Sequence, residues 1–286
     1  MRRLTLLMLL FCLALSFKSF AQEDLLDELE SEIEVDSTVT SAFKGLKIVN
    51  IESTKLVAEK DFFFIIAHRF GSIKGGLDEF FGLDTSSIRF SLIYSFADWF
   101  NVGFSRSSYN KVYDLAFKYR FVQQEKGGFP FTIVGFSSVA ANTAFDEDQF
   151  TDFEFKHRLT YLTEALISRK FTDKLSLQIS PILFHENFVE NDLQENTQFA
   201  LGAGGRYKIS KYVSINMDYA YHFNRASNSP FRNPLSLGVD IETGGHVFQL
   251  HLTNAQPMYD AGFLTNATGD WSEGDIYLGF NLSRVF

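Results

Sequence analysis

The sequence predicts an all-β protein, a transmembrane antiparallel up-and-down β-barrel of about twelve strands (roughly 10 to 14). Three observations support this. Apolar and polar residues alternate in many segments after residue 62, the N-terminus has the pattern of an export signal, and the chain ends on an alternating segment whose last residue is Phe286. Because lipid offers no hydrogen-bond partner to the backbone, a closed barrel is one of only two structures that can span a membrane.

The first 21 residues are predicted to be a signal peptide. Arg2 and Arg3 precede an apolar run over residues 4–17, and Ser19 to Ala21 supply small residues for cleavage. The run is shorter than the roughly 20 residues that a membrane-spanning helix needs. Cys12, the only cysteine, lies inside it, so the mature chain has no thiol for catalysis, disulfides or zinc binding.

Residues 22–45 are predicted to form an acidic segment in the periplasm. Eight Asp and Glu residues between residues 23 and 36 carry most of the formal net charge of −9. Leu25, Leu26, Leu29 and Ile33 recur among them at roughly helical spacing. This pattern indicates either a helix that docks on a periplasmic partner or a solvated leader. The excess of acidic residues also argues against nucleic acid as a partner.

Residues 46–286 are predicted to be the barrel domain. Short connections at every second place indicate turns in the periplasm, and the mostly long connections between them indicate loops on the outside. The period-2 segments are residues 62–70, 88–96, 100–106, 113–121, 131–140, 153–171, 175–185, 199–209, 213–223, 235–242, 246–253 and 274–286.

The two faces of these segments distinguish a membrane barrel from a soluble β-sandwich or lipocalin-like barrel. One face is apolar and rich in aromatic residues, which make up 16% of the chain. The other is charged, and a soluble core could not bury so many unpaired charges. We therefore expect the aromatic face to contact lipid and the charged face to line an aqueous lumen. The charged residues are Arg89, Asp114, Lys118, Arg120, Glu154, Lys156, Arg158, Asp218, Asp240 and Glu242.

The last segment is predicted to close the barrel and to carry its insertion signal. Apolar side chains alternate there up to the C-terminal aromatic residue, and this is the pattern that the barrel assembly machinery reads. Phe280, Leu282 and Phe286 are the residues to which we assign the signal. Arg284 departs from the pattern, although its stem can snorkel at the membrane edge.

Seven separated motifs cover most of residues 40–286: Ala42 to Gly45, His68 to Gly71, Glu79 to Asp84, Arg106 to Tyr109, Gly204 to Lys208, Glu242 to His246 and Gly279 to Phe286. In these motifs the chain resembles a family of outer-membrane β-barrels of unknown function. The resemblance implies a barrel in the outer membrane of a Gram-negative-type cell, with the lipid bilayer as its partner. It implies no activity and no functional residues.

Strand parity places a group of polar side chains on the lumen face. Imidazole and carboxylate groups can ligate a divalent metal, which makes His222, Asp240, Glu242 and His251 weak candidates. Their spacing matches no known metal signature, so a solvated or salt-bridged network is favoured, and no metal and no other cofactor is predicted. The full predicted lumen wall comprises Asp218, His222, Asp240, Glu242, Gln249 and His251.

Two further patterns carry less information. Gly202, Gly204 and Gly205 lie within a strand segment and are predicted to permit curvature rather than to bind phosphate. A lipid-modifying barrel enzyme would need a base beside a hydroxyl, and His246 with Ser236 or Thr243 is the available pair. An interfacial histidine beside a Gly-Gly turn explains His246 more simply, so no catalytic residue is predicted.

These features give three hypotheses for function. The leading one is a non-enzymatic barrel that acts as a narrow pore or solute passage with weak ion selectivity. The second is a plugged structural or accessory barrel that docks a periplasmic partner through its acidic N-terminal segment. A lumenal or interfacial enzyme ranks third.

Overall fold

The computed structural model describes residues 38–145, 152–189 and 192–286. The predicted signal peptide and residues 22–37 of the predicted acidic segment lie outside this part of the chain. Among the described residues, no helix is long and apolar enough to cross a membrane.

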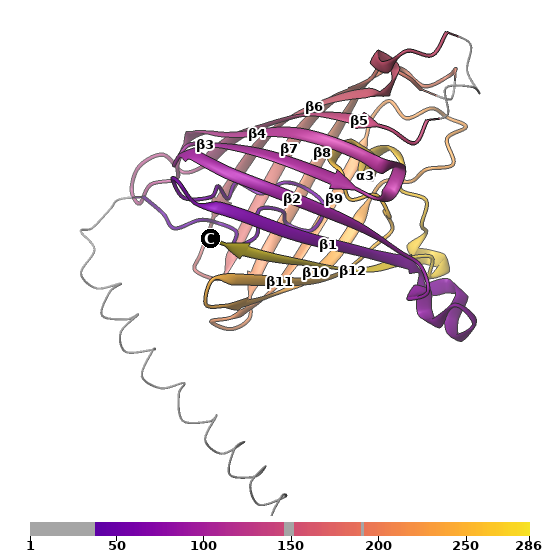
Figure 1. Cartoon of the computed structure of the whole chain (residues 1–286). Coiled ribbons are helices and arrows are strands. Elements are labelled where there is room, and N and C mark those ends of the chain that lie inside the picture. Colours follow the sequence, from indigo (N-terminus) through magenta and orange to yellow (C-terminus); the bar gives the residue numbers. More distant parts are fainter. Residues whose placement is uncertain (1–37, 146–151, 190–191) are drawn as a thin grey trace, which may run out of the picture. The chain divides into compact units, whose positions relative to one another are not determined.

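Twelve antiparallel strands form a closed barrel in which each strand pairs with its neighbours in the sequence and the first pairs with the last (Figure 1). This confirms the predicted fold and strand number. The strands are β1 (Phe62–Ser72), β2 (Ser86–Ala97), β3 (Phe100–Ser107), β4 (Val112–Val122), β5 (Thr132–Asn142), β6 (Leu159–Lys170), β7 (Leu175–Glu186), β8 (Thr197–Lys208), β9 (Val213–His222), β10 (Leu235–Thr243), β11 (His246–Thr253) and β12 (Tyr277–Val285).

The predicted start of β6 is wrong by six residues. The alternation predicts a strand from Phe153, but a short 3-10 helix, η4 (Phe155–Arg158), comes first and the strand begins at Leu159. Glu154 and Lys156, predicted on the lumen face, therefore lie before the strand with exposed side chains that pair with each other at 3.1 Å. Arg158 ends the 3-10 helix and contacts the ring of Phe153.

The two faces of the wall differ as a membrane barrel requires. In β2, the outward side chains of Phe90, Leu92 and Tyr94 are exposed, whereas Arg89 and Ser91 point inward and are buried. A water-soluble protein would show the reverse, because its exposed face would be polar. The apolar outer face therefore fits a lipid environment.

The barrel closes where the chain's last strand meets its first. Phe286 donates its backbone N–H to Phe62 at 2.8 Å and accepts one from it at 3.1 Å, which extends the β1–β12 ladder to the last residue. Phe280 and Leu282 point outward on the same strand, and His68 of β1 stacks on Phe280. Arg284 lies over the ring of Phe286 at 4.7 Å.

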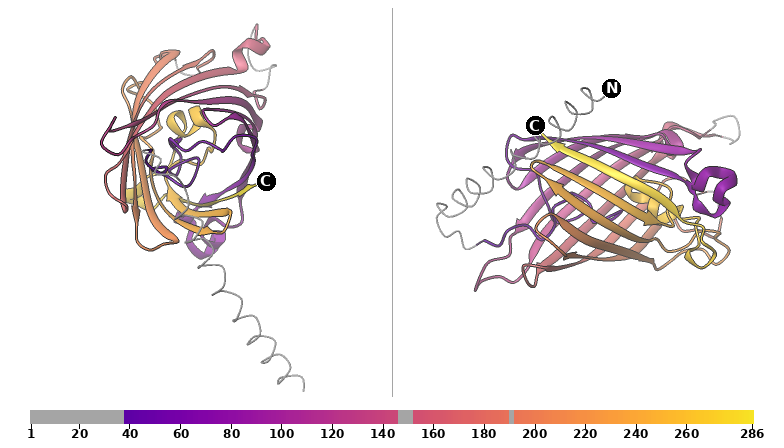
Figure 2. Two further views of the ribbon diagram at one scale, coloured as in Figure 1. Left: turned by 90° about the vertical axis from the view of Figure 1, so that its left-hand side faces the viewer. Right: turned by 90° about the horizontal axis from the view of Figure 1, so that it is seen from below.

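Two segments of the chain fold into the ring of strands (Figure 2). The first, residues 39–58, leads directly into β1 and is called the N-terminal plug. The second, residues 254–276 between β11 and β12, is called the α3 loop and contains α3 (Asp260–Thr265) and η5 (Trp271–Glu273). All six residues of α3 are buried.

Candidate functional site: the occupied lumen

The N-terminal plug is a tight hairpin whose apolar residues are buried. The backbone N–H of Ile48 donates to Ile51 at 2.8 Å, and that of Ser53 donates to Leu46 at 2.8 Å, so the chain reverses direction around Val49 and Asn50. The hairpin's own hydrogen bonds satisfy only some of its backbone N–H and C=O groups. The remaining polar groups must find partners on the barrel wall.

The tip of the hairpin binds one carboxylate of the wall. Asp218 of β9 accepts the backbone N–H groups of Val49, Asn50 and Ile51 on one oxygen, at 2.9, 2.7 and 3.0 Å. Asp218 is 2% exposed, so water does not compete for these bonds. Successive N–H groups converging on one anion form a backbone nest.

The side chain of Asn50 adds a second attachment at the same place. Its amide donates to Ser236 of β10 at 2.9 Å and to Thr253 of β11 at 3.1 Å. Its carbonyl oxygen accepts from the buried Arg69 of β1 at 3.0 Å. Polar contacts thus tie the tip to four strands, and Ile51 adds an apolar contact by packing in the apolar core of the lumen.

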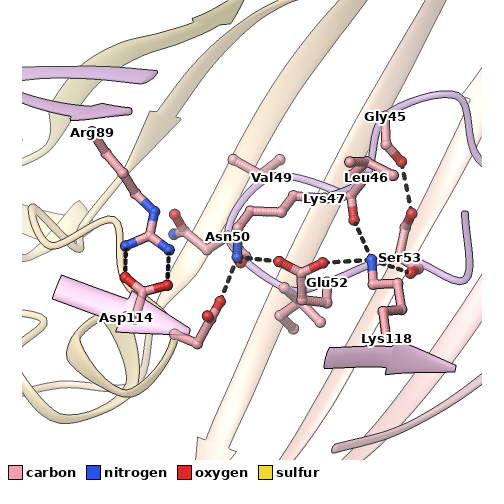
Figure 3. A network of polar contacts seen from close by, with 12 residues as sticks. Gly45, Leu46, Lys47, Val49, Asn50, Glu52, Ser53, Arg89, Asp114 and Lys118 are labelled. Carbon is pink, nitrogen blue, oxygen red and sulfur yellow. Dashed lines mark hydrogen bonds and ion pairs between the residues drawn. The ribbon is translucent and has the colours of Figure 1, made fainter. Parts of the chain in front are cut away.

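The legs of the hairpin carry a network of buried charges (Figure 3). Lys118 of β4 pairs with Glu52 at 2.5 Å and donates to the carbonyl oxygens of Leu46 and Ser53, both at 3.1 Å. Lys47 pairs with Glu52 at 2.6 Å and with Asp260 of α3 at 2.5 Å. The Lys47 side chain therefore joins the N-terminal plug to the α3 loop inside the barrel.

These cations set the ionisation of Glu52. Burial alone would raise the pKa of this carboxyl, but the ammonium groups of Lys118 and Lys47 outweigh burial and lower it to about 2. Glu52 is therefore charged at neutral pH. Beside it, Arg89 and Asp114 form a two-bond pair on the wall at 2.6 and 2.7 Å.

The α3 loop is held mainly by apolar contacts, in a cluster that also includes Ile51 and Leu56 of the plug. Ala261, Phe263 and Leu264 pack in an apolar cluster with inward side chains of β5, β6 and β7, including Phe136 and Leu166. Leu264 and Leu166 are fully buried. Each large apolar side chain in such a cluster contributes about 1.5 to 3 kcal/mol on burial, so this loop is an integral part of the core.

Two of the predicted curvature glycines make room for the plug. A Cβ at Gly202 would lie 2.9 Å from the side chain of Ile51, and one at Gly204 would lie 2.6 Å from that of Ile48. On β10, a Cβ at Gly238 would lie 3.1 Å from Val49. Gly205 points to the other face, towards Leu177. The inward glycines thus let the wall and the plug approach closely.

The predicted lumen-wall residues do not form one open surface. Asp218 holds the plug tip, Asp240 accepts from Gln249 at 2.9 Å, and Gln249 also donates to the plug carbonyls of Lys47 and Ile48. His251 is a buried residue of β11, the strand that pairs with β10 and β12. The other two lie apart from this group: Glu242 pairs with Arg206 and with Lys44 of the plug, and His222 packs on Phe184 at the opposite end of the barrel.

The candidate metal ligands and one of the two candidate enzyme pairs are also separated, whereas Thr243 and His246 lie directly opposite each other on β10 and β11. Among the described residues, no group of three or more His, Cys, Asp and Glu side chains could hold a metal ion. Ser236 pairs across the β10–β11 hairpin with Thr253, at the opposite end of the two strands from Thr243 and His246. Ser236 and His246 therefore cannot act together.

The described residues enclose separate cavities in the lumen. One of about 600 Å³ lies at the end with the long loops, and one of about 160 Å³ lies at the end where the plug begins, beside Val39 and Gln123. Between them, beside Lys47, Glu52 and Arg89, a cavity of about 60 Å³ is left. The N-terminal plug and the α3 loop thus interrupt the path through the barrel.

The sequence prediction misses the residues that occupy the lumen. Lys47, Glu52 and Asp260 lie outside the alternating segments, so no periodic pattern marks them. The inward glycines are the one available signal, since a strand residue without a side chain often marks a close backbone approach.

Comparison with known proteins identifies the family. The family model described as "Membrane bound beta barrel domain (DUF5777)" matches residues 43–286, so the chain belongs to this family. The predicted resemblance is confirmed. As a closed antiparallel barrel of a membrane-bound family, the protein lies in the outer membrane, where its partner is the lipid bilayer.

Solved barrels similar to the chain include three from outer membranes. The KdgM porin is 10% identical, with 78% of this chain and 98% of that chain covered and a TM-score of 0.46. The Acinetobacter baumannii outer membrane protein Omp33 is 10% identical, with 80% and 99% covered and a TM-score of 0.46. The COG4313 outer membrane channel from Pseudomonas putida F1 is 13% identical, with 81% and 97% covered and a TM-score of 0.43. No curated protein matches the sequence.

Proposed function

We propose that the protein is a non-enzymatic, gated solute passage of the outer membrane, closed in this conformation by the N-terminal plug. The observation that carries this proposal is the polar attachment of the plug tip to the wall at Asp218, Ser236, Thr253 and Arg69. The plug supplies Ile51 and Leu56 to the apolar cluster, whereas the α3 loop supplies five residues: Ala255, Ala261, Phe263, Leu264 and Ala267.

Polar contacts make the plug the movable element. When the plug leaves, water can take over hydrogen bonds to the wall, so their net contribution to closure is only about 0.5 to 1.5 kcal/mol per neutral bond. Moving the α3 loop would separate five residues, among them Phe263 and Leu264, from the apolar cluster, whereas moving the plug separates Ile51 and Leu56 from it. The lumen wall beside the plug is also rich in small hydroxyl and amide side chains that suit water: Ser91, Ser95, Asn101, Ser105, Ser168, Gln178, Ser180, Ser214, Asn216, Asn281 and Ser283.

The alternative function is a permanently plugged accessory barrel. It would dock a periplasmic partner through the acidic residues 23–36, which lie outside the described part of the chain. In both cases the barrel assembly machinery would read the terminal strand with Phe280, Leu282 and Phe286.

A reversible disulfide between plug and wall tests the passage directly. The hydroxyl oxygens of Thr54 on the plug and Ser168 on β6 are 2.6 Å apart, and the mature chain is predicted to have no cysteine of its own. In planar bilayers, Thr54→Cys/Ser168→Cys should lose channel openings when oxidised and regain them with a reductant. Ser137→Cys/Thr163→Cys, which joins β5 to β6 on the lipid face where the hydroxyls are 3.3 Å apart, is the matched control and should conduct in both states.

Deletion of residues 42–57 distinguishes the two functions. A gated passage should then conduct continuously through the space that the plug leaves beside β1, β9, β10 and β11, because the remaining α3 loop packs on β5, β6 and β7. A folded, heat-modifiable barrel that stays non-conducting after the deletion would refute the passage and support the accessory barrel.

A further inference from the structure

The cavity of about 600 Å³ at the end with the long loops has the size and construction of a ligand site. Its volume falls within the roughly 300 to 1,000 Å³ typical of small-molecule pockets. The ends of β4 to β9 that lead into the long loops form its walls, through residues such as Gln198 and His222. The α3 loop contributes Tyr259, Thr265 and Asn266, and because that loop belongs to the apolar core, the cavity is preformed.

A buried histidine in the cavity wall has unused hydrogen-bonding capacity. His222 is 4% exposed, and neither ring nitrogen has a hydrogen-bond partner among the described residues. One side of its ring packs on Phe184, with the ring centres 5.4 Å apart. A neutral imidazole has one donor and one acceptor, and burying both without partners is unfavourable. A ligand in the cavity could satisfy them.

The charged side chains of the lining balance each other. Glu186 accepts a hydrogen bond from the buried amide of Gln198 at 2.7 Å. Arg225 donates to the backbone carbonyl of Leu264 at 2.8 Å. With one carboxylate and one guanidinium, the lining favours neither an anion nor a cation. Its amides and imidazoles offer donors and acceptors together, as the hydroxyl groups of a ligand require.

Aromatic rings supply the apolar part of the same lining. Phe188, Phe231 and Tyr259 border the cavity. The face of an aromatic ring carries partial negative charge, so it attracts the polarised C–H groups on the flat face of a sugar ring. Rings combined with balanced donors and acceptors match a saccharide better than a lipid chain or an ion.

We propose that this cavity binds a short uncharged saccharide, with His222 and Gln198 contacting its hydroxyl groups and Phe231 stacking on a sugar ring. The inference goes beyond the gated passage and does not depend on it, because the cavity exists while the plug is in place.

Isothermal titration calorimetry on the full-length protein in detergent tests the proposal. The probes are maltotriose, cellotriose, mannotriose, xylotriose and chitotriose, with trigalacturonic acid as the anionic counterpart and triglycine as the zwitterionic one. At least one neutral trisaccharide should bind with a Kd below about 1 mM, and the two charged probes should bind at least about tenfold more weakly.

Substitutions in the lining assign that binding to the cavity. His222→Leu and Gln198→Leu should each weaken it by about tenfold or more, because a site built for hydroxyl groups loses its partners. Phe231→Ala, in the loop between β9 and β10, should do the same without touching the barrel wall. Gln123→Leu, at the opposite end beside the cavity of about 160 Å³, is the control and should bind as the wild type does.

Three results would overturn the proposal. The first is no binding of any neutral trisaccharide. The second is tighter binding of trigalacturonic acid than of every neutral probe. The third is wild-type affinity in heat-modifiable, and therefore folded, His222→Leu and Phe231→Ala proteins.

Discussion

Replacing Asp218 by alanine should release the plug while leaving the barrel assembled. The carboxylate accepts three backbone N–H groups of the plug tip, and a methyl side chain in its place would offer none of them a partner. A buried donor left without an acceptor costs roughly 1 to 3 kcal/mol. Three such donors at the low end destabilise the closed conformation by about 3 kcal/mol, which corresponds to about a 150-fold change in the ratio of open to closed molecules.

Single-channel recording measures this ratio as an open probability. A second measurement is the rate at which a membrane-impermeant maleimide labels Val49→Cys, since Val49 is 3% exposed in the closed conformation. Both quantities should rise steeply in Asp218→Ala. The comparison is Asp240→Ala on the neighbouring strand, which removes no acceptor from the plug backbone and acts on the plug only through Gln249, so its effect should be smaller. Equal effects of the two substitutions, or a wild-type labelling rate in Asp218→Ala, would refute the anchoring role of Asp218.

Three further outcomes follow from the barrel and its plug. Deleting Phe286, or replacing it with Asp, should prevent assembly because this residue extends the β1–β12 ladder; heat-modifiability of outer-membrane fractions measures it, and wild-type levels would contradict it. Tyr219→Arg on the lipid face should lower the free energy of unfolding by about 2 to 4 kcal/mol if Tyr219 lies near mid-membrane, and Asn216→Arg on the lumen face, where Asn216 is buried, should raise the open probability instead. Acid should also open the plug: the folded-state pKa of Glu52 is lowered to about 2, so its ion pairs stabilise closure above its unfolded pKa of roughly 4.3 and are lost as the pH falls from there towards 2; the open probability in planar bilayers should rise over that range in the wild type but not in Glu52→Gln.

The strands and their faces could be predicted because alternation is a local signal. In β4, Tyr113 and Leu115 point outward and Asp114 and Lys118 point inward, as expected from neighbouring letters alone. The start of β6 could not be predicted, because Phe153 and Phe155 continue the alternation into a 3-10 helix. The alternation along a strand can therefore be read from the sequence, whereas the residue at which the strand begins depends on the fold.

The lumen's contents depend on contacts that no local pattern contains. The bonds between the plug tip and Asp218 join residues 167 to 169 positions apart, and Lys47 reaches Asp260 across 213 positions. Asp218 and Asp240 have the same parity and similar neighbours, yet one binds the plug backbone and the other binds a wall side chain. The sequence therefore indicates a polar lumen but cannot say which of its residues face water and which face the plug.

The inward glycines show that the wall is shaped for the plug, and they allow a last test. Gly204 lies directly opposite Asp218 across the β8–β9 pair, and a Cβ there would lie 2.6 Å from the Cδ1 atom of Ile48. Overpacking of this kind typically costs about 1 to 3 kcal/mol. The approach to Ile48 exists only in the closed conformation, whereas the longer approaches to the backbone oxygen of Met217 at 3.1 Å and the Cβ atom of Asp218 at 3.3 Å lie within the wall and affect both conformations. Gly204→Ala should therefore raise the open probability roughly 5- to 150-fold.

The neighbouring glycine provides the control for this substitution. Gly205→Ala changes the same strand by the same methyl group, but on the face away from the plug, so it should leave the open probability unchanged. Ile48→Val removes the Cδ1 atom that the methyl group introduced by Gly204→Ala would strike. If the contact is the cause, the double variant Gly204→Ala/Ile48→Val should be closed more often than the sum of the two single effects predicts. Strict additivity, or equal opening by Gly204→Ala and Gly205→Ala, would mean that these glycines are needed for the geometry of the strand and not for contact with the plug. The shape of the wall would then not support a lumen that the plug closes and opens.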